Sequence, residues 1–202
     1  NYIHGEEITT VMPYRFFGQQ RRRYLRAADA VVAVSGFTRQ ALIHLMGLEA
    51  AKIELIHNGV DAERFQPGLK NPALIERYGI QGKRVLLTVG RLVRRKGLIP
   101  FVSQALPLLL ARRQDWIYLV VGEGPERLDL ESAVRSLSLA SHVKVLGFLD
   151  EQAARAAFAM ADLFIMPNVP TPGDPEGFGL VTLEARAAGA PVVAADLEGI
   201  RD

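Results

Sequence analysis

Cationic side chains and glycines gather where a strand-like run ends. The apolar run Val85–Val89 leads into residues 90–97, which read Gly-Arg-Leu-Val-Arg-Arg-Lys-Gly. Arginine and lysine bind phosphate through charge and N–H donors, and open parallel sheets bind ligands beyond the carboxyl ends of their strands. We therefore expect Arg91 and Lys96 to hold a diphosphate. For the Arg94–Arg95 pair, a solvent-facing basic loop is the favoured interpretation.

Two glutamates separated by seven residues bracket a glycine-bearing segment further along the chain. Residues 175–185 read Pro-Glu-Gly-Phe-Gly-Leu-Val-Thr-Leu-Glu-Ala, so Glu176 precedes an expected helix and Glu184 lies inside it. The N–H groups of residues 177–180 would point out from the helix start, where they can donate to phosphate or hydroxyl oxygens. Carboxylates accept hydrogen bonds from sugar or ribose hydroxyls. The alternative, two structural acids with Glu176 near a positive helix end, stays open.

A second glycine turn follows the run Ile117–Val121. Residues 122–126 read Gly-Glu-Gly-Pro-Glu, which supplies the first two glycines of the Gly-x-Gly-x-x-Gly dinucleotide fingerprint. Arg127 stands where the third glycine should be. We interpret the segment as a tight turn, with Pro125 at the first position of a helix, rather than as a dinucleotide site.

The elements that must position these residues alternate regularly from residue 83 onward. Apolar runs separated by helix-length stretches are typical of β-α-β units, whose parallel strands are buried on both faces. Five such runs predict a doubly wound α/β domain. The expected strands are Val85–Val89, Ile117–Val121, Val143–Leu146, Leu163–Met166 and Pro191–Ala195, and the expected helices are Leu98–Arg113, Leu128–Leu139, Glu151–Ala161 and Leu180–Ala188.

The first 60 residues carry part of a second α/β unit. Ala30–Val34 and Ile53–Ile56 are strand-like, and a helix is expected between them over Ser35–Met46. Ser35 is a suitable N-cap for this helix, and Gly47 a suitable stop.

A linker is expected near residues 59–70, which carry a turn signal and the pair Pro67-Gly68. We therefore divide the chain into residues 1–62, the end of one domain, and residues 63–202, most of another. The chain opens without methionine and stops directly after a strand-like run, so we expect both domains to be incomplete.

Four blocks together resemble one protein family. They are Gly90-Arg91…Lys96-Gly97, the glutamate pair Glu176…Glu184, Ile56-His57-Asn58-Gly59-Val60-Asp61 and Ala28-Asp29-Ala30-Val31-Val32-Ala33-Val34-Ser35. In order and spacing they resemble the retaining GT-B glycosyltransferases of the GT4 family, also called glycosyl transferases group 1. The resemblance implies two Rossmann-like, doubly wound domains. It also implies transfer of a hexosyl group from a nucleotide diphosphate sugar, with retention of the anomeric configuration.

The resemblance further implies a role for each matching residue. It assigns the donor diphosphate to Arg91 and Lys96, the ribose to Glu184, and the transferred sugar to Glu176 and His4 as catalytic residues. The remaining implied contacts are those of the backbone at Gly177, Phe178, Gly179 and Leu180 with sugar and phosphate, and those of Gly147, Phe148 and Asp150 beside the base. No metal and no separate cofactor are expected, because cationic side chains and helix ends can stabilise the leaving diphosphate.

Some positions depart from the family pattern or match it only briefly. His4 rests on the short segment Tyr2–Glu7, and an ordinary loop histidine is the alternative. Family members often carry Gly-Gly-Ile-Pro-Glu after the fifth strand, whereas residues 198–202 read Glu-Gly-Ile-Arg-Asp. The acceptor-side loop and the returning C-terminal helix of the family have no counterpart in this chain. We therefore expect a fragment that is inactive alone.

Composition excludes several other classes. With 49% hydrophobic and 23% charged residues the chain reads as globular rather than disordered. A net charge of +2 gives no reason to expect nucleic acid as a partner, and the absence of cysteine removes disulfides and thiolate sites. The four histidines lie far apart in sequence, and no apolar run approaches the length of a membrane span.

One basic segment suggests a second kind of partner. On a helical wheel the residues on one face are Arg15, Arg22, Arg23 and Arg26, with Phe17, Tyr24 and Leu25 broadly opposite. Such a helix can lie on an anionic membrane, which would suit a lipid acceptor; the favoured alternative is a solvated basic face with its aromatics packed inward. We expect a cytoplasmic protein, with peripheral contact on the cytoplasmic face of a membrane as an option. The acceptor itself, a glycan, a lipid or a small molecule, stays open.

Two other functions compete with the transferase. A nucleotide-sugar-binding module or inactive partner would keep the donor site without turnover. A sugar-nucleotide epimerase with the same architecture is disfavoured by the glutamate pair.

Overall fold

The computed structural model of the protein describes residues 2–4, 15–68 and 71–202, and it divides the chain into two compact units. Unit 1 comprises Asn1–Gly59, Pro170–Leu180 and Asp196–Asp202. Unit 2 comprises Val60–Val169 and Val181–Ala195. The first boundary between the units lies after Gly59, within the segment from residue 57 to residue 61 whose sequence indicates a turn.

Unit 1 contains a parallel sheet of three strands in the order β1-β2-β3. Its core gathers apolar residues of the strands and of two helices, Leu25, Val31, Leu42, Met46 and Ile53 among them. The elements are β1 (Tyr2–Ile3), α2 (Arg15–Ala27), β2 (Val31–Ala33), α3 (Gly36–His44), the 3-10 turn η1 (Ala50–Lys52) and β3 (Ile53–Leu55).

Helix α3 begins and ends as its sequence predicts. The Ser35 hydroxyl accepts a hydrogen bond from the Thr38 N–H at 3.0 Å, which caps the helix start. At the other end Gly47 has φ +65°, and its N–H donates to the carbonyl of Ile43 at 3.0 Å. Both the predicted N-cap and the predicted stop are confirmed.

The basic helix α2 uses two of its arginines on the end of α3. The Arg22 guanidinium donates to the Leu45 carbonyl at 2.6 Å, and that of Arg26 donates to the Gly47 carbonyl at 3.1 Å. Cations at a helix C-terminus are favourable, because the carbonyls there carry partial negative charge. The prediction that the aromatic residues of this helix pack inward is wrong for Tyr24, which is 75% exposed. Leu25, on the same predicted face, is buried. The side chains of Arg15 and Phe17 lie outside the described residues.

Unit 2 is built on a parallel sheet of five strands in the order β6-β5-β4-β7-β8. Its strands are β4 (Arg84–Val89), β5 (Trp116–Val121), β6 (Val143–Gly147), β7 (Leu163–Met166) and β8 (Val192–Ala194). All five match the runs expected from the sequence to within one or two residues at each end. The order reverses at β4, which places a switch point between β4 and β7, as in doubly wound folds.

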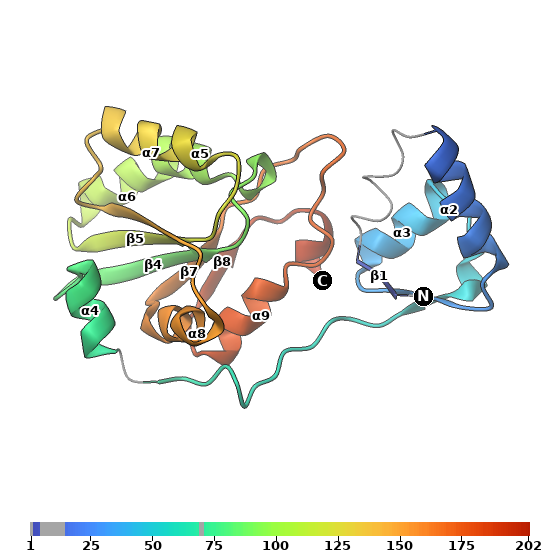
Figure 1. Ribbon diagram of the computed structural model, residues 1–202, viewed down its shortest axis with the longest axis horizontal. Coiled ribbons are helices and arrows are strands. Elements are labelled where there is room, and N and C mark those ends of the chain that lie inside the picture. The colour runs from blue at the N-terminus through green and yellow to red at the C-terminus, as the bar shows by residue number, and fades with distance from the viewer. Residues whose placement is uncertain (1, 5–14, 69–70) are drawn as a thin grey trace. The chain divides into compact units, whose positions relative to one another are not determined.

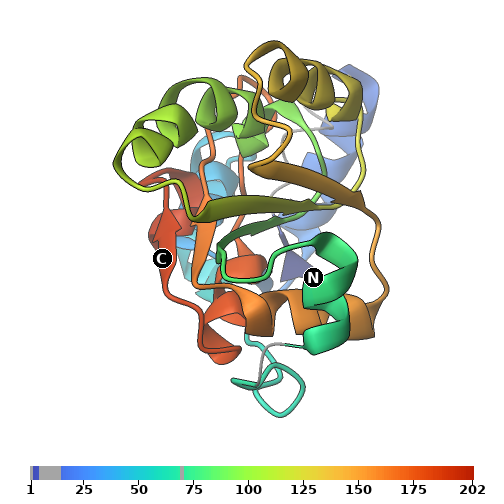
Figure 2. The ribbon, with the colours of Figure 1, turned by 90° about the vertical axis from the view of Figure 1, so that its left-hand side faces the viewer.

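Helices cover both faces of this sheet. Helices α5 (Leu98–Pro100), α6 (Leu106–Arg112) and α7 (Arg127–Ser136) lie on one face, and α8 (Glu151–Met160) and α9 (Leu180–Ala187) lie on the other (Figure 1). Figure 2 shows the strands nearly edge-on between the two layers. A π-helical stretch, η3 (Phe101–Ala105), joins α5 to α6, and η2 (Arg94–Lys96) and η4 (Glu198–Arg201) are short 3-10 turns.

A small polar network lies inside the sheet of unit 2. The buried Tyr118 hydroxyl donates to Thr88 Oγ1 at 2.7 Å, and the Thr88 hydroxyl donates to the Ile165 carbonyl. Burial raises the pKa of Tyr118 above its ordinary value, which keeps the phenol neutral. The chain of donors therefore links β5, β4 and β7 across the middle of the sheet without a buried charge.

Sequence inspection did not anticipate helix α4 (Pro72–Tyr78), although its signals are present. The Asn71 side chain accepts from the N–H groups of Ala73 and Leu74, and Pro72 takes the first helical position. Gly79 ends the helix in the left-handed region with φ +59°.

The segment expected to be a linker packs on unit 2. Arg64 forms an ion pair with Glu151 at the start of α8, and the Phe65 ring meets that of Phe158 edge to face at a centroid distance of 5.7 Å. These contacts attach residues 64 and 65 to helix α8.

At the carboxyl ends of the strands, backbone segments approach so closely that a side chain has no room. A Cβ atom built on Gly97, which has φ +62°, would lie 2.0 Å from the Pro167 carbonyl oxygen. One built on Gly122, with φ +133°, would lie 1.9 Å from the Gly90 carbonyl oxygen. Such distances are far inside van der Waals contact, so these positions require glycine.

Two glycine substitutions separate crowding from backbone strain. Gly82 has φ +67°, close to that of Gly97, but a Cβ there would meet nothing within 4 Å. We expect Gly82→Ala to cost about 1–2 kcal/mol of unfolding free energy through its left-handed backbone alone. Gly97→Ala should cost about 3 kcal/mol or more, because β7 and η2 must separate as well. Denaturant unfolding of both variants measures the difference, and equal losses would show that the close approach is unimportant.

Candidate functional site

The candidate site lies at the carboxyl ends of β4, β5 and β6, within unit 2. Hydrogen bonds join the three loops there: Gly90 N–H donates to the Val121 carbonyl at 2.9 Å, and Gly122 N–H donates to the Gly147 carbonyl at 2.8 Å. Ligands of open α/β sheets bind at this edge. The loops after β4, β5 and β6 therefore form one connected surface, the floor of the site, rather than three independent segments.

A pocket of about 330 Å³ opens on this floor. Its volume is at the lower end of the range typical for small-molecule sites. It is lined by Val89, Gly90, Arg91, Val121, Gly122, Glu123, Phe148, Leu149 and Ala154.

The two predicted phosphate-binding cations both lie beside Gly90. Arg91 is exposed and lines the pocket. Lys96 is only 8% exposed, and its Nζ lies 3.8 Å from where a Cβ of Gly90 would stand. A lysine so buried is uncommon, and an anion bound at this edge would complement its charge.

The prediction that Arg94 and Arg95 both face solvent is wrong for Arg95. Arg94 is exposed, but Arg95 is only 6% exposed, and its carbonyl accepts from the Val169 N–H at 2.9 Å. Arg95 is buried because the loop after β7 packs over η2. This packing fixes the backbone that carries Lys96.

Of the three predicted base-side residues, Phe148 lies in the pocket lining, whereas Gly147 and Asp150 do not. Gly147 is buried with φ +74°, and Phe148 is 78% exposed, so its ring faces outward at the pocket. The Asp150 carboxylate accepts from the Ala153 N–H at 2.8 Å and thereby caps α8. Of these residues Phe148 offers the open apolar surface.

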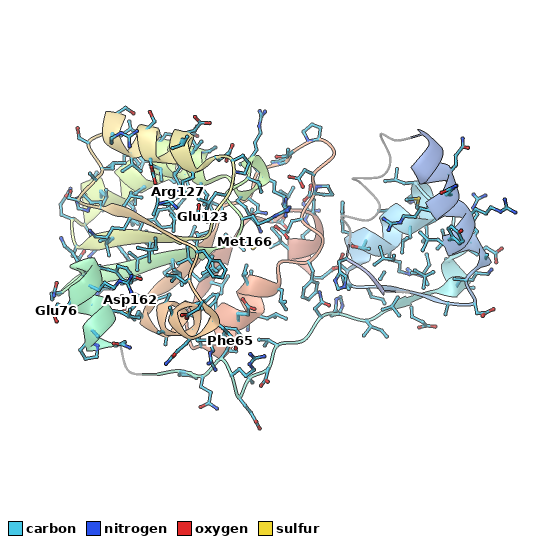
Figure 3. The ribbon with its side chains drawn as sticks, viewed as in Figure 1. Phe65, Glu76, Glu123, Arg127, Asp162 and Met166 are labelled. Carbon is cyan, nitrogen blue, oxygen red and sulfur yellow. The ribbon has the colours of Figure 1, made fainter. Side chains whose placement is uncertain are left out.

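Sequence reasoning missed an ion-pair network that includes Glu123, a residue of the pocket lining. Arg127 forms ion pairs with Glu123, in the turn after β5, and with Glu131, one turn further along α7 at 2.9 Å. Figure 3 labels Glu123 and Arg127. The spacing of four residues on either side of Arg127 was the available signal.

Pro125 was expected at the first helical position, but α7 begins at Arg127 after a cap at Glu126.

Glu184 lies in the second turn of α9, as predicted, and is half-buried. Burial raises the pKa of its carboxyl above the ordinary value, because desolvation disfavours the charged form. Leu180 is the first residue of the helix, and Gly179 before it has φ +85°. The predicted run of N–H groups at residues 177–180 therefore does lead into a helix.

Glu176 belongs to unit 1, where residues near the C-terminus of the chain bind its backbone. Its N–H donates to the Glu198 carboxylate, and its carbonyl accepts from the Gly199 N–H at 3.1 Å. A Cβ on Gly199 would lie 2.0 Å from the Gly177 carbonyl oxygen. The Glu198 carboxylate therefore binds the backbone of the Glu176 loop.

His4, the other predicted catalytic residue, follows β1 in unit 1 and is exposed. The neighbouring Gly5, Glu6 and Glu7 of its motif lie outside the described residues. Unit 2 thus brings Arg91, Lys96 and the Gly147–Phe148 pair to one edge, while His4 and Glu176 belong to unit 1.

Neither a metal centre nor a membrane span is found in the described part of the chain. No group of three or more histidine or acidic side chains there could hold a metal ion. Likewise, none of the helices described is both long and apolar enough to cross a bilayer.

The parallel sheets and the glycine-bearing edge define an α/β protein of the Rossmann-like class. Comparison with known families narrows this class. Residues 71–202 match the family described as "Glycosyl transferases group 1", and residues 3–64 match "Glycosyltransferase Family 4". The chain belongs to the glycosyl transferases group 1 family, and its fold is of the GT-B type.

Similar proteins agree with this assignment. A GDP-mannose-dependent alpha-(1-6)-phosphatidylinositol monomannoside mannosyltransferase of Mycolicibacterium smegmatis is 40% identical over 177 residues, 86% of this chain and 46% of that protein. A 2-deoxystreptamine glucosyltransferase of Streptomyces kanamyceticus is 32% identical over 184 residues, 88% of this chain and 45% of that protein. The chain thus spans about half the length of the curated relatives it matches.

A solved structure shares the fold over nearly the whole chain. The Anabaena protein Alr3699/HepE, in complex with UDP and glucose, superposes with a TM-score of 0.79 at 24% identity. The match covers 99% of this chain and 53% of that protein.

The raised pKa of Glu184 gives a pH-dependent prediction. The folded protein binds the proton of this carboxyl more tightly than the unfolded chain does. The free energy of unfolding therefore falls as pH rises from the ordinary pKa of 4.5 through the raised folded pKa, and the loss is complete above it. We therefore expect Glu184→Gln to raise the melting temperature of the ligand-free protein near neutral pH and to leave it nearly unchanged near pH 4. Thermal unfolding at both pH values measures this. A variant that melts lower at neutral pH would contradict the buried-charge account.

Proposed function

We propose that the protein transfers a hexosyl group from a nucleotide diphosphate sugar to an acceptor, with retention of the anomeric configuration and without a metal ion. The observation that carries the proposal is the placement of Lys96 and Arg91 beside Gly90 at the sheet edge of a glycosyl transferases group 1 chain. Cations at that edge suit a diphosphate better than any neutral ligand.

The chemistry follows from the leaving group. When the bond between the anomeric carbon and the diphosphate oxygen breaks, negative charge develops on the diphosphate. Fixed cations that face this charge stabilise the transition state more than the ground state. Arg91 and Lys96 supply two such cations, so no metal ion is needed for this step.

The other site residues are assigned by what their groups can accept or donate. The Glu184 carboxylate accepts from the ribose hydroxyls, and the N–H groups of residues 177–180 donate to sugar and phosphate oxygens. Glu176 and His4 contact the transferred sugar. Binding of Glu176 by Glu198 and Gly199 supports this role, because it fixes the loop that carries the carboxylate.

Retention is proposed from the family resemblance, in which the acceptor attacks from the face that the diphosphate leaves. Analysis of the anomeric configuration of the product, by NMR coupling constants, tests this point separately from transfer itself.

We propose a membrane lipid as the acceptor. The mannosyltransferase relative is named for a phosphatidylinositol monomannoside, and helix α2 exposes Arg23 and Tyr24 together. A basic residue beside an exposed aromatic suits the interface of an anionic membrane.

The transfer is tested with a matched pair of variants of the full chain. Lys96→Ala should weaken binding of nucleoside diphosphates by about tenfold or more, because it removes a charge-assisted contact. Arg94→Ala removes an exposed cation of the same loop, and it should change binding by less than about threefold. Calorimetry with GDP and UDP measures binding, and mass spectrometry of an acceptor mixture measures transfer.

The alternatives are distinguished by the same experiments. Nucleotide binding by the full-length protein without any glycoside product would favour a binding module, and release of an epimerised free sugar would favour an epimerase. If no nucleotide binds, the donor-site proposal fails.

Membrane contact is tested by charge reversal. Arg23→Glu should weaken binding of the full chain to phosphatidylserine vesicles, measured by co-sedimentation, by about tenfold or more, because each charge near such a surface contributes about 1 kcal/mol and the reversal changes two. Arg112→Glu, an exposed arginine at the end of α6, is the control with the same charge change. Equal weakening by both variants would indicate a general charge effect rather than a contact through α2.

A further inference from the structure

The pocket at the carboxyl edge of unit 2 contains an acid as well as a cation. Among the described residues that line it, Glu123 carries the one carboxylate and Arg91 the one cationic group. Arg91 is accounted for by the diphosphate. Glu123 is not, since a carboxylate repels phosphate, so it must face a different part of a bound ligand or serve the structure alone.

The carboxylate of Glu123 is held in place. Arg127 binds Glu123 through Nη1 and Glu131 through Nε, so its guanidinium is clamped between two acids. An arginine at the start of a helix opposes the helix dipole, and these two contacts offset that cost. The side chain of Glu123 is nonetheless 51% exposed, against 30% for Glu131. The half-exposed acid of the pocket lining is therefore held by its ion pair with Arg127.

Gly147, the last residue of β6, has no side chain and so leaves room for this ion pair. A Cβ on Gly147 would lie 2.8 Å from Glu123 Oε1 and 3.1 Å from Arg127 Nη1. The pair thus lies directly against Gly147, next to the exposed ring of Phe148. The lining of the pocket therefore includes both an apolar ring and a carboxylate held by an ion pair.

We propose that Glu123 is a specificity-determining residue that accepts hydrogen bonds from the N1–H and 2-amino groups of a guanine base, and that Arg127 is its positioning residue. The inference rests on the proposed function, because the base of a nucleoside diphosphate must occupy the pocket. Phe148 provides the surface on which the base stacks.

The donor pattern of the bases explains the preference. Guanine presents two adjacent N–H donors on one edge, which match the two acceptor oxygens of a carboxylate. Uracil presents one N–H between two carbonyl oxygens, and these oxygens repel a carboxylate. A site with a fixed acceptor discriminates strongly against a ligand that lacks the matching donor.

Inosine diphosphate isolates the proposed contact, because its base is guanine without the 2-amino group. In the unaltered full chain we expect GDP to bind about tenfold or more tightly than inosine diphosphate or UDP. In Glu123→Gln the advantage of GDP over inosine diphosphate should fall to about twofold or less, with UDP affinity changed by less than about threefold. Calorimetry of the three nucleotides with both proteins measures these ratios.

Two further variants separate a role in recognition from a role in structure. Glu131→Gln removes the acid on the other side of Arg127, outside the pocket lining, and should leave the ratio of GDP to inosine diphosphate affinity within about twofold of its original value. Arg127→Gln should lower that ratio as Glu123→Gln does, while thermal unfolding shows that the variants remain folded. A purely structural network would instead weaken all three nucleotides equally.

The outcomes also separate this inference from the proposed function. Equal binding of GDP, inosine diphosphate and UDP to the unaltered protein, or an unchanged GDP advantage in Glu123→Gln, overturns the role of Glu123 while leaving the diphosphate site intact. Failure of every nucleotide to bind overturns both.

Discussion

The close approach of backbone to backbone at the carboxyl edge of the five-stranded sheet is the constraint on which the site depends. Gly122 lies against the Gly90 carbonyl, and Gly97 lies against the Pro167 carbonyl, at distances that exclude any side chain. Each contact joins the loops of two strands. Because these loops cannot move independently, the groups that they carry keep fixed positions relative to one another, which is the preorganisation that binding of a charged ligand requires.

Charge is distributed unevenly over this rigid edge. Arg91 and the buried Lys96 lie beside Gly90, and the ion pair of Glu123 and Arg127 lies against Gly147. A ligand with an anionic end and a hydrogen-bond-donating end matches both sides at once, and a nucleoside diphosphate is such a ligand. The middle of the sheet stays neutral, because the Tyr118 hydroxyl is kept protonated by burial and is hydrogen-bonded to Thr88.

The strands and most helices could be predicted from the sequence because fully apolar runs leave few alternatives to a buried parallel sheet. Short elements without such runs were harder: α4 depends on its capping residues Asn71 and Gly79, and β1 has two residues. Glycine spacing indicated turns but not which backbone each glycine would meet. That partner is set by strand order, which links residues such as Gly97 and Pro167 that lie 70 positions apart.

The candidate site was predictable in its residue types and less so in its surroundings. Lys96 and Arg91 follow from the motif, whereas the burial of Arg95 depends on the later loop that packs over it. The same is true of Glu198, whose contact with the N–H of Glu176 spans 22 residues. Long-range contacts of this kind leave no local pattern, although the spacing of Glu123, Arg127 and Glu131 did carry one.

Hydrogen–deuterium exchange of the full chain with and without saturating GDP tests the central claim most directly. If a nucleoside diphosphate binds at the carboxyl edge of β4, β5 and β6, exchange should slow in residues 90–97, 122–127 and 147–150 together, because all three loops share one rigid floor. Protection confined to other segments, or exchange unchanged at saturation, would contradict the account.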